Sequence, residues 1–83
     1  MAKKSKFEIA IVDNVKAVRT KNGLTQDDIA AFLNVTRGFI GQIESPNSAS
    51  KYNFDHLNTL AREMNCSPKD FMPERAVAEG KGK

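Results

Sequence analysis

The sequence predicts an all-α fold in which five short helices pack into one compact domain. Apolar residues recur at the three- and four-residue spacing of a helix that buries one face, and residues suited to capping a helix precede four of these segments. A chain of 83 residues holds one modest core, so closely packed helices have to supply nearly all of its stability.

The first helix is expected to begin at Phe7 and to end before Gly23. Phe7, Ile11, Val15 and Val18 recur at helical spacing and share one face. Gly23 provides a stop, because glycine adopts the left-handed backbone conformation that often closes a helix.

Residues 25–44 predict two short helices joined by a tight break. Thr25 can accept a free backbone N–H at the start of the second helix, Asp28 is placed to return that bond, and Thr36 repeats the capping role before the third helix. Asn34 stands at the break, where a residue that tolerates left-handed angles is needed. The expected buried positions are Ile29, Ala30, Leu33, Ile40 and Ile43. Since Ala30 is small, the two helices can cross closely at the steep angle of a helix-turn-helix.

The fourth and fifth helices follow a polar loop that begins at Ser45-Pro46. Asn53 is a plausible cap for the fourth helix, and Asn65 can close it. Its expected buried face consists of Phe54, Leu57, Leu60, Ala61 and Met64. The segment Ser67-Pro68-Lys69-Asp70 carries three helix-start signals, which predict a brief fifth helix ending at Pro73. We therefore expect a flexible basic leader at 1–6, a helix-turn-helix domain at 7–73 and a disordered tail at 74–83.

Composition excludes several classes of protein. The net charge of +3 and the pI near 9.2 suggest a nucleic-acid partner. The excess lies at the two ends, because the leader carries +3 and residues 74–83 carry +1. Residues 7–73 therefore carry a net charge of −1. The single cysteine, Cys66, excludes an intrachain disulfide and a paired-cysteine metal site. No apolar run approaches the length of a membrane span, and no nucleophile with a neighbouring base or phosphate-cradling loop is present. We expect a cytoplasmic protein that is not an enzyme, uses no metal or cofactor and has no membrane partner.

The segment from Val15 to Met72 resembles the Cro and phage-repressor type of helix-turn-helix regulator, also called the xenobiotic-response-element family. The residues that carry the resemblance are Leu24-Thr25-Gln26, Ala30, Asn34-Val35-Thr36, Ile40 and Ile43-Glu44, followed by Leu57, Leu60-Ala61 and the run from Asn65 to Phe71. The resemblance implies a compact five-helix domain that binds double-stranded DNA as a homodimer. Two departures are Asn34, where the family usually has glycine, and a slightly longer loop after Glu44.

The resemblance also implies the residues of the DNA interface. The outward face of the third helix would contact bases, and arginine can bind guanine and glutamine adenine. The expected base-contacting residues are Thr36, Arg37, Gly38, Gly41 and Gln42. The expected phosphate-contacting residues are Gln26, Thr25, Lys21, Asn47 and Lys51. Arg19 and Glu44 are expected to form a structural ion pair.

Two alternatives remain open at this stage. Gly38 and Gly41 each cost about 1 kcal/mol of helix propensity relative to alanine. Either they allow the helix backbone to approach the groove closely, or the third helix is weak and tightens on binding. The leading function is a sequence-specific transcriptional regulator, expected to be a repressor, that reads the major groove. The alternative is a protein-binding module, such as an antitoxin or adaptor with weak DNA readout, in which case a toxin or another protein is the partner.

Overall fold

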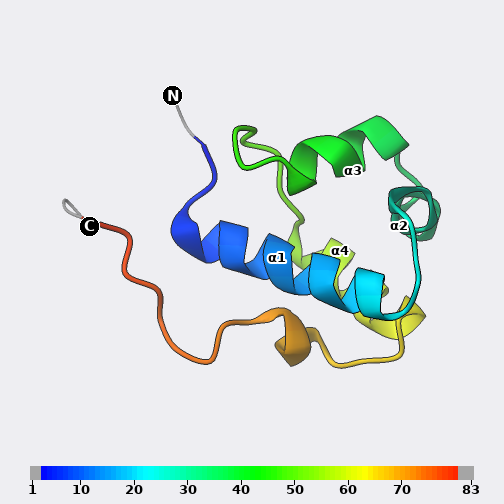
Figure 1. The fold of residues 1–83 in the computed structure, drawn as a ribbon. Helices are drawn as coiled ribbons and strands as arrows, with labels where there is room; N and C mark the ends of the chain where they lie inside the picture. The colour runs from blue at the N-terminus through cyan, green and yellow to red at the C-terminus, as the bar shows by residue number, and fades with distance from the viewer. Residues whose placement is uncertain (1–2, 81–83) are drawn as a thin grey trace.

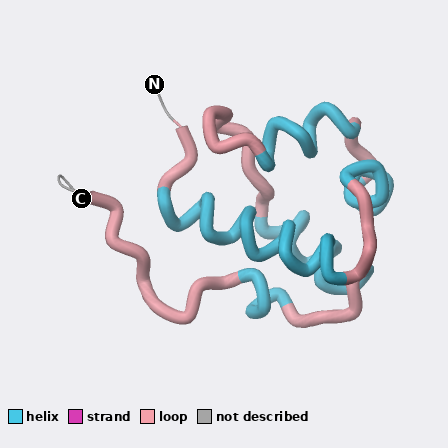
Figure 2. Tube along the Cα trace, in the orientation of Figure 1, coloured by secondary structure: helices cyan, strands magenta, loops and turns pink. Residues whose placement is uncertain are grey.

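The computed structural model describes residues 3–80 and contains four α-helices and one short 3-10 helix within that range (Figures 1 and 2). The helices are α1 (Lys6–Lys21), α2 (Gln26–Leu33), α3 (Arg37–Glu44), α4 (Phe54–Glu63) and η1 (Pro68–Phe71). The described segment forms no strand, so the all-α prediction is confirmed. Helix α2 packs against α3 and α4, and η1 packs against α1 and α4.

The predicted brief fifth helix is present as η1, but it is a 3-10 helix of four residues, so the count of five α-helices is not confirmed. Ser67 caps it and Pro68 occupies its first position, as the sequence signals predict. Pro73 limits its length, since proline disfavours helical angles in the residue before it, and Met72 is accordingly extended with a ψ of 139°.

The predicted caps and breaks of the other helices are confirmed. Thr25, Thr36 and Asn53 each accept a backbone N–H from the first turn of their helix. Asn34 has a φ of 58° and closes α2 in the left-handed conformation, and Gly23 has a φ of 70° in the turn after α1. These signals are local, so the sequence alone locates the starts of α2, α3 and α4.

The start of α1 was missed by one residue. Ser5 caps the helix by accepting the Glu8 N–H at 3.1 Å, and the Glu8 carboxylate accepts the Ser5 N–H at 2.8 Å. The signal was present in the sequence, because serine followed three residues later by glutamate is a capping box. It places Lys6 inside the helix and brings the leader close to the folded domain.

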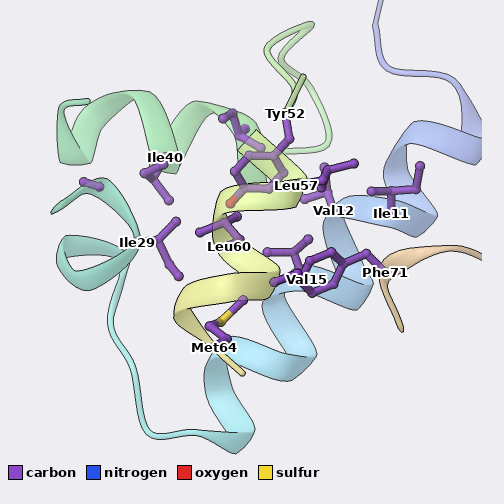
Figure 3. Packing of buried hydrophobic residues seen from close by; sticks show 13 residues of the cluster. Ile11, Val12, Val15, Ile29, Ile40, Tyr52, Leu57, Leu60, Met64 and Phe71 are labelled. Carbon is purple, nitrogen blue, oxygen red and sulfur yellow. The ribbon is translucent and has the colours of Figure 1, made fainter. Parts of the chain in front are cut away.

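All four α-helices and η1 contribute to one core (Figure 3). Figure 3 shows the labelled side chains of the helices converging at its centre. The fully buried side chains are Val15, Ile29, Ile40, Ile43, Leu60 and Phe71. Helix α3 thus supplies two of the innermost residues and is held firmly from behind.

The prediction that Phe54 lies in the core is wrong, because its side chain is 87% exposed. Phe54 is the first residue of α4, where the helix extends past the edge of the core. Tyr52, two residues earlier in the incoming loop, is buried instead. Phe7, in the first turn of α1, is also exposed.

Both ends of the described chain lie on the same side of the molecule, because the segment after η1 runs back along α1 (Figure 1). The Glu79 carboxylate accepts the backbone N–H groups of Lys6 at 2.9 Å and Phe7 at 3.0 Å. In the leader, the side chain of Lys4 is buried. The mobility expected for 1–6 and 74–83 stays a prediction, and residues 1–2 and 81–83 of these segments lie outside the described residues.

Candidate nucleic-acid interface

Helix α3 presents a polar face to solvent and an apolar face to the core. Ile40 and Ile43 are fully buried. The candidate base-contacting residues are exposed, with the exception of the half-buried Gly41: Thr36, Arg37, Gly38, Gly41 and Gln42. The Thr36 hydroxyl caps the helix by accepting the Phe39 N–H at 3.1 Å. Thr36, Arg37, Gly38 and Gln42 are therefore open to a ligand.

A buried ion pair fixes the end of α3 to α1. The Arg19 guanidinium donates from Nε to Glu44 Oε2 and from Nη2 to Glu44 Oε1, both at 3.0 Å. The two side chains are only 13% and 6% exposed. Arg19 also donates to the Leu24 carbonyl at 3.0 Å, which fixes the turn before α2. Such a two-pronged pair mainly fixes geometry.

Gln26 joins this pair from the start of α2. Its side-chain amide donates to Glu44 Oε1 at 2.9 Å, so one carboxylate links three helices. The side-chain oxygen of Gln26, Oε1, faces α3. It lies 3.9 Å from the position that a Cβ at Gly41 would occupy. Gln26 is thus held at the junction of α2 and α3.

Arg37, the strongest candidate for base readout, has an acidic neighbour. Its Nε lies 3.7 Å from Asp27 Oδ1, and the two side chains are 67% and 73% exposed. An exposed pair at this distance stabilises a fold by about 0 to 1 kcal/mol. Arg37 can therefore exchange Asp27 for another partner at little energetic cost.

Packing within residues 3–80 requires neither glycine of α3. A Cβ at Gly38 would lie 4.0 Å from the Thr36 hydroxyl, and one at Gly41 would make the 3.9 Å contact with Gln26. Both distances are ordinary van der Waals contacts, so alanine fits at either position.

The loop after α3 contacts the candidate reading face. The Ser50 hydroxyl donates to Gln42 Oε1 at 3.3 Å. The Lys4 ammonium donates to the backbone carbonyls of Ser45, Ser48 and Ser50 at 2.8, 2.6 and 2.9 Å. Burial lowers the pKa of the Lys4 ammonium, Glu8 opposes this shift and Lys51 adds to it. The loop therefore has a fixed shape next to Gln42.

The candidate phosphate-contacting residues are in different situations. Lys21 and Asn47 are exposed. Thr25 is engaged with Asp28, because its hydroxyl both donates to the carboxylate at 3.1 Å and accepts the Asp28 N–H at 3.2 Å. Lys51 is directed to α1, where its ammonium forms an ion pair with Glu8. The bond from Lys51 is the main cause that lowers the pKa of the Glu8 carboxyl.

An apolar groove lies between the first turns of α1 and α4, and none of the residues that line it belongs to α3. It has a volume of about 380 Å³ and is lined in part by Phe7, Ile11, Phe54 and Leu57. Lys51 and Glu8 supply charges of both signs at its border. The exposed Phe54 ring stands beside a groove of sufficient size to receive an aromatic side chain.

Other kinds of site receive no support from residues 3–80. This range holds no group of three or more histidine, cysteine or acidic side chains arranged to bind a metal. None of the helices it contains is long and apolar enough to span a bilayer. Cys66 is half-buried at the end of α4, and burial raises the pKa of its thiol.

Sequence reasoning missed three residues of this region. Lys4 reads as one of several lysines in a basic leader, and no local pattern indicates its distant carbonyl partners. Ser50 and Asp27 likewise acquire their roles only when the loop and α2 are brought next to α3. Long-range contacts of this kind have no signature in a single sequence.

Comparison with known proteins agrees with this geometry. Residues 15–71 match the model of a protein family described as "Helix-turn-helix". The crystal structure of the restriction-modification controller protein C.AhdI from Aeromonas hydrophila is similar, with a TM-score of 0.65 and 19% identity over 77% of this chain and 94% of that chain. At that identity the likeness shows the fold alone. No curated protein matches the chain.

The family model covers more than half of the chain, including the α2–α3 unit and the buried Arg19–Glu44 pair. The chain therefore belongs to the Cro/C1-type helix-turn-helix family and is a DNA-binding domain of transcription regulation.

Proposed function

We propose that this chain is a sequence-specific repressor that inserts α3 into the major groove of its operator. The observation that carries the proposal is the exposed polar face of α3, fixed from behind by Ile40, Ile43 and the Arg19–Glu44 pair. A helix with its side chains is about 10 to 12 Å across, which matches the width of about 12 Å of the major groove. The eight residues of α3 are therefore narrow enough to lie in the groove.

Two side chains of α3 provide most of the sequence discrimination in this proposal. The Arg37 guanidinium suits the O6 and N7 atoms of guanine, and the Gln42 amide suits the N6 and N7 atoms of adenine. Each such pair discriminates against a wrong base by about 1 to 3 kcal/mol. Arg37 leaves Asp27 when it binds, and Gln42 keeps the orientation that Ser50 supports.

Phosphate contacts fix the register of the domain on the duplex. Gln26 stands at the start of α2, where backbone N–H groups favour an anion. Lys21 and Asn47 are exposed and free to join it. Thr25 and Lys51 contribute only if they give up Asp28 and Glu8 respectively, so we assign them a smaller share.

The active form in this proposal is a homodimer. One α3 reads few base pairs, and two copies on half-sites about 34 Å apart multiply the specificity. The groove beside Phe54 is a suitable contact for a second copy, because the exposed Phe7 and Phe54 rings line it and a two-fold axis brings the same apolar patch of both copies together. Burial of exposed aromatic rings provides about 200 Å² per copy, well below the roughly 800 Å² of a stable interface. The dimer is therefore expected to form mainly on DNA.

A protein-binding module remains the second candidate function. The two glycines on the α3 face and the charge of −1 over residues 7–73 favour it, because both weaken readout and attraction to DNA. In that case the same fold serves as an antitoxin or adaptor. A tight protein partner together with DNA binding would be compatible with both roles.

Selection of bound sequences from a random duplex pool tests the proposal. We expect enrichment of an inverted repeat with half-sites about one helical turn apart. The variant Arg37→Ala should lose preference at one position in each half-site, whereas Lys69→Ala, which removes an equal charge from η1, should keep the selected sequence. Failure to enrich any sequence would leave the protein-binding function as the better account.

A further inference from the structure

The side chain of Lys4 connects the leader to the loop after α3. Its side chain is 7% exposed, although lysine is usually a surface residue. The ammonium donates to the carbonyls of Ser45, Ser48 and Ser50 at 2.6 to 2.9 Å. Since an ammonium has three hydrogens, the three carbonyls satisfy it completely. We call this arrangement the Lys4 clamp.

The Lys4 clamp also completes the end of α3. Helix α3 has no basic residue in its last turn, and Ser45 is its C-cap. The last carbonyls of a helix lack partners within the helix and carry a partial negative charge. Lys4, from a segment 41 residues earlier in the chain, supplies the positive charge and one of the missing donors.

The same contacts reach the reading face through Ser50. The backbone carbonyl of Ser50 accepts from Lys4, and its hydroxyl donates to Gln42 Oε1 at 3.3 Å. A second bond, from the Ser50 N–H to the Ser48 hydroxyl at 3.1 Å, stiffens the loop. One residue, Ser50, therefore connects the buried Lys4 ammonium to Gln42, a side chain expected to read a base.

We propose that Lys4 is a positioning residue for sequence readout, which orders the loop 45–50 before DNA binds and so orients Gln42. The inference rests on the proposed function and assigns to the leader a role that differs from general attraction to phosphate. Preordering the loop matters because a partly populated binding state weakens the apparent affinity in proportion to its population.

The free chain provides the first test, with Lys4→Met compared with Lys3→Met. Both variants remove one positive charge, and Lys3 is exposed. Lys4→Met should shift and broaden the amide resonances of residues 45–50 and 42, whereas Lys3→Met should leave them in place. Unchanged resonances in Lys4→Met would overturn the proposal. This test needs no DNA, so it remains informative if the chain binds no duplex and the proposed function fails.

Titration with the selected duplex provides the second test. If the loop of Lys4→Met is ordered in about a tenth of the molecules, its Kd rises about tenfold relative to Lys3→Met. The Gln42→Ala variant identifies the base pair that Gln42 reads. Lys4→Met should also lose discrimination at that base pair. Equal affinity and equal discrimination in the two lysine variants would overturn the proposal.

Ser50→Ala keeps the inference testable if Lys4→Met does not fold. This variant removes the hydroxyl that contacts Gln42 and leaves the three carbonyls of the Lys4 clamp intact. Discrimination should weaken at the Gln42 position alone, with the thermal midpoint unchanged. A fully retained preference at that position would show that the loop does not orient Gln42.

Discussion

Glu44 links three helices through one carboxylate, because it accepts hydrogen bonds from Arg19 on α1 and Gln26 on α2. The role of a single residue is predictable where the residue belongs to a family pattern. The pairing of Arg19 with Glu44 follows from the resemblance to the Cro and phage-repressor family alone. Lys4 could not be predicted in the same way, because its partners are backbone carbonyls more than 40 residues away. A side chain's burial depends on the whole fold.

Removal of the Glu44 charge should strongly destabilise the domain. Glu44→Gln leaves the Arg19 guanidinium buried without a counter-ion, which costs about 3 kcal/mol of the free energy of unfolding. Urea unfolding followed by circular dichroism measures this loss. The exposed Arg37–Asp27 pair offers a control, since Asp27→Asn should change stability by less than about 1 kcal/mol. Equal effects of the two substitutions would contradict the structural role of Glu44.

Asp27→Asn should strengthen DNA binding. The substitution frees Arg37 and removes a negative charge from the edge of the expected interface. We expect a Kd lower by about threefold to tenfold at low salt, with the difference shrinking as salt screens the charges. Fluorescence anisotropy on the selected duplex measures it, and Asp13→Asn, an equal charge change on the exposed side of α1, is the control. An unchanged or weaker affinity in Asp27→Asn would place Arg37 away from the DNA.

Among the features of the helices, the sequence predicts their ends best. Thr25, Thr36 and Asn53 cap the helices that they were expected to cap, because capping involves only the next three residues. The fifth element begins where its start signals predict, but it is a 3-10 helix, because Pro73 follows closely. The loop 45–53 was predicted only as a loop, and its contacts depend on Lys4 and Glu8 from a distant segment.

The double variant Gly38→Ala/Gly41→Ala separates the two explanations for the glycines of α3. Both Cβ atoms fit, so the free energy of unfolding should rise by about 1 kcal/mol or more from helix propensity. If the helix backbone approaches the groove closely, the more stable variant should nevertheless bind the selected duplex at least about tenfold more weakly, by steric exclusion. Parallel urea unfolding and anisotropy titrations measure both quantities. Unchanged or tighter DNA binding would rule out close approach.

At the scale of the whole molecule, the all-α class and the course of the chain from α1 to α4 could be predicted, because amphipathic spacing determines which faces are buried. The exposed surfaces of the molecule could not be predicted from the sequence. Phe54 has helical spacing with Leu57 and Ala61, yet it lies beyond the end of the core, and only the packed structure reveals that edge. The groove beside it arises where α1 and α4 begin next to each other.

Phe54→Ser should abolish cooperative binding without unfolding the domain. Phe54 is exposed and at the first position of α4, so stability should change by less than about 0.5 kcal/mol. Wild-type chain should bind a duplex with two half-sites more tightly than one with a single half-site, and the variant should lose this difference while its affinity for the single half-site is retained. Undiminished cooperativity in Phe54→Ser would exclude the groove as the contact between copies.

The most direct test of the account is the map of amide resonance changes when labelled chain is titrated with the selected duplex. We predict the largest changes at residues 36–42 of α3 and its cap, with smaller ones at the start of α2 and in the loop 45–50. Changes confined to the groove between α1 and α4, or no changes at α3, would contradict the claim that α3 enters the DNA.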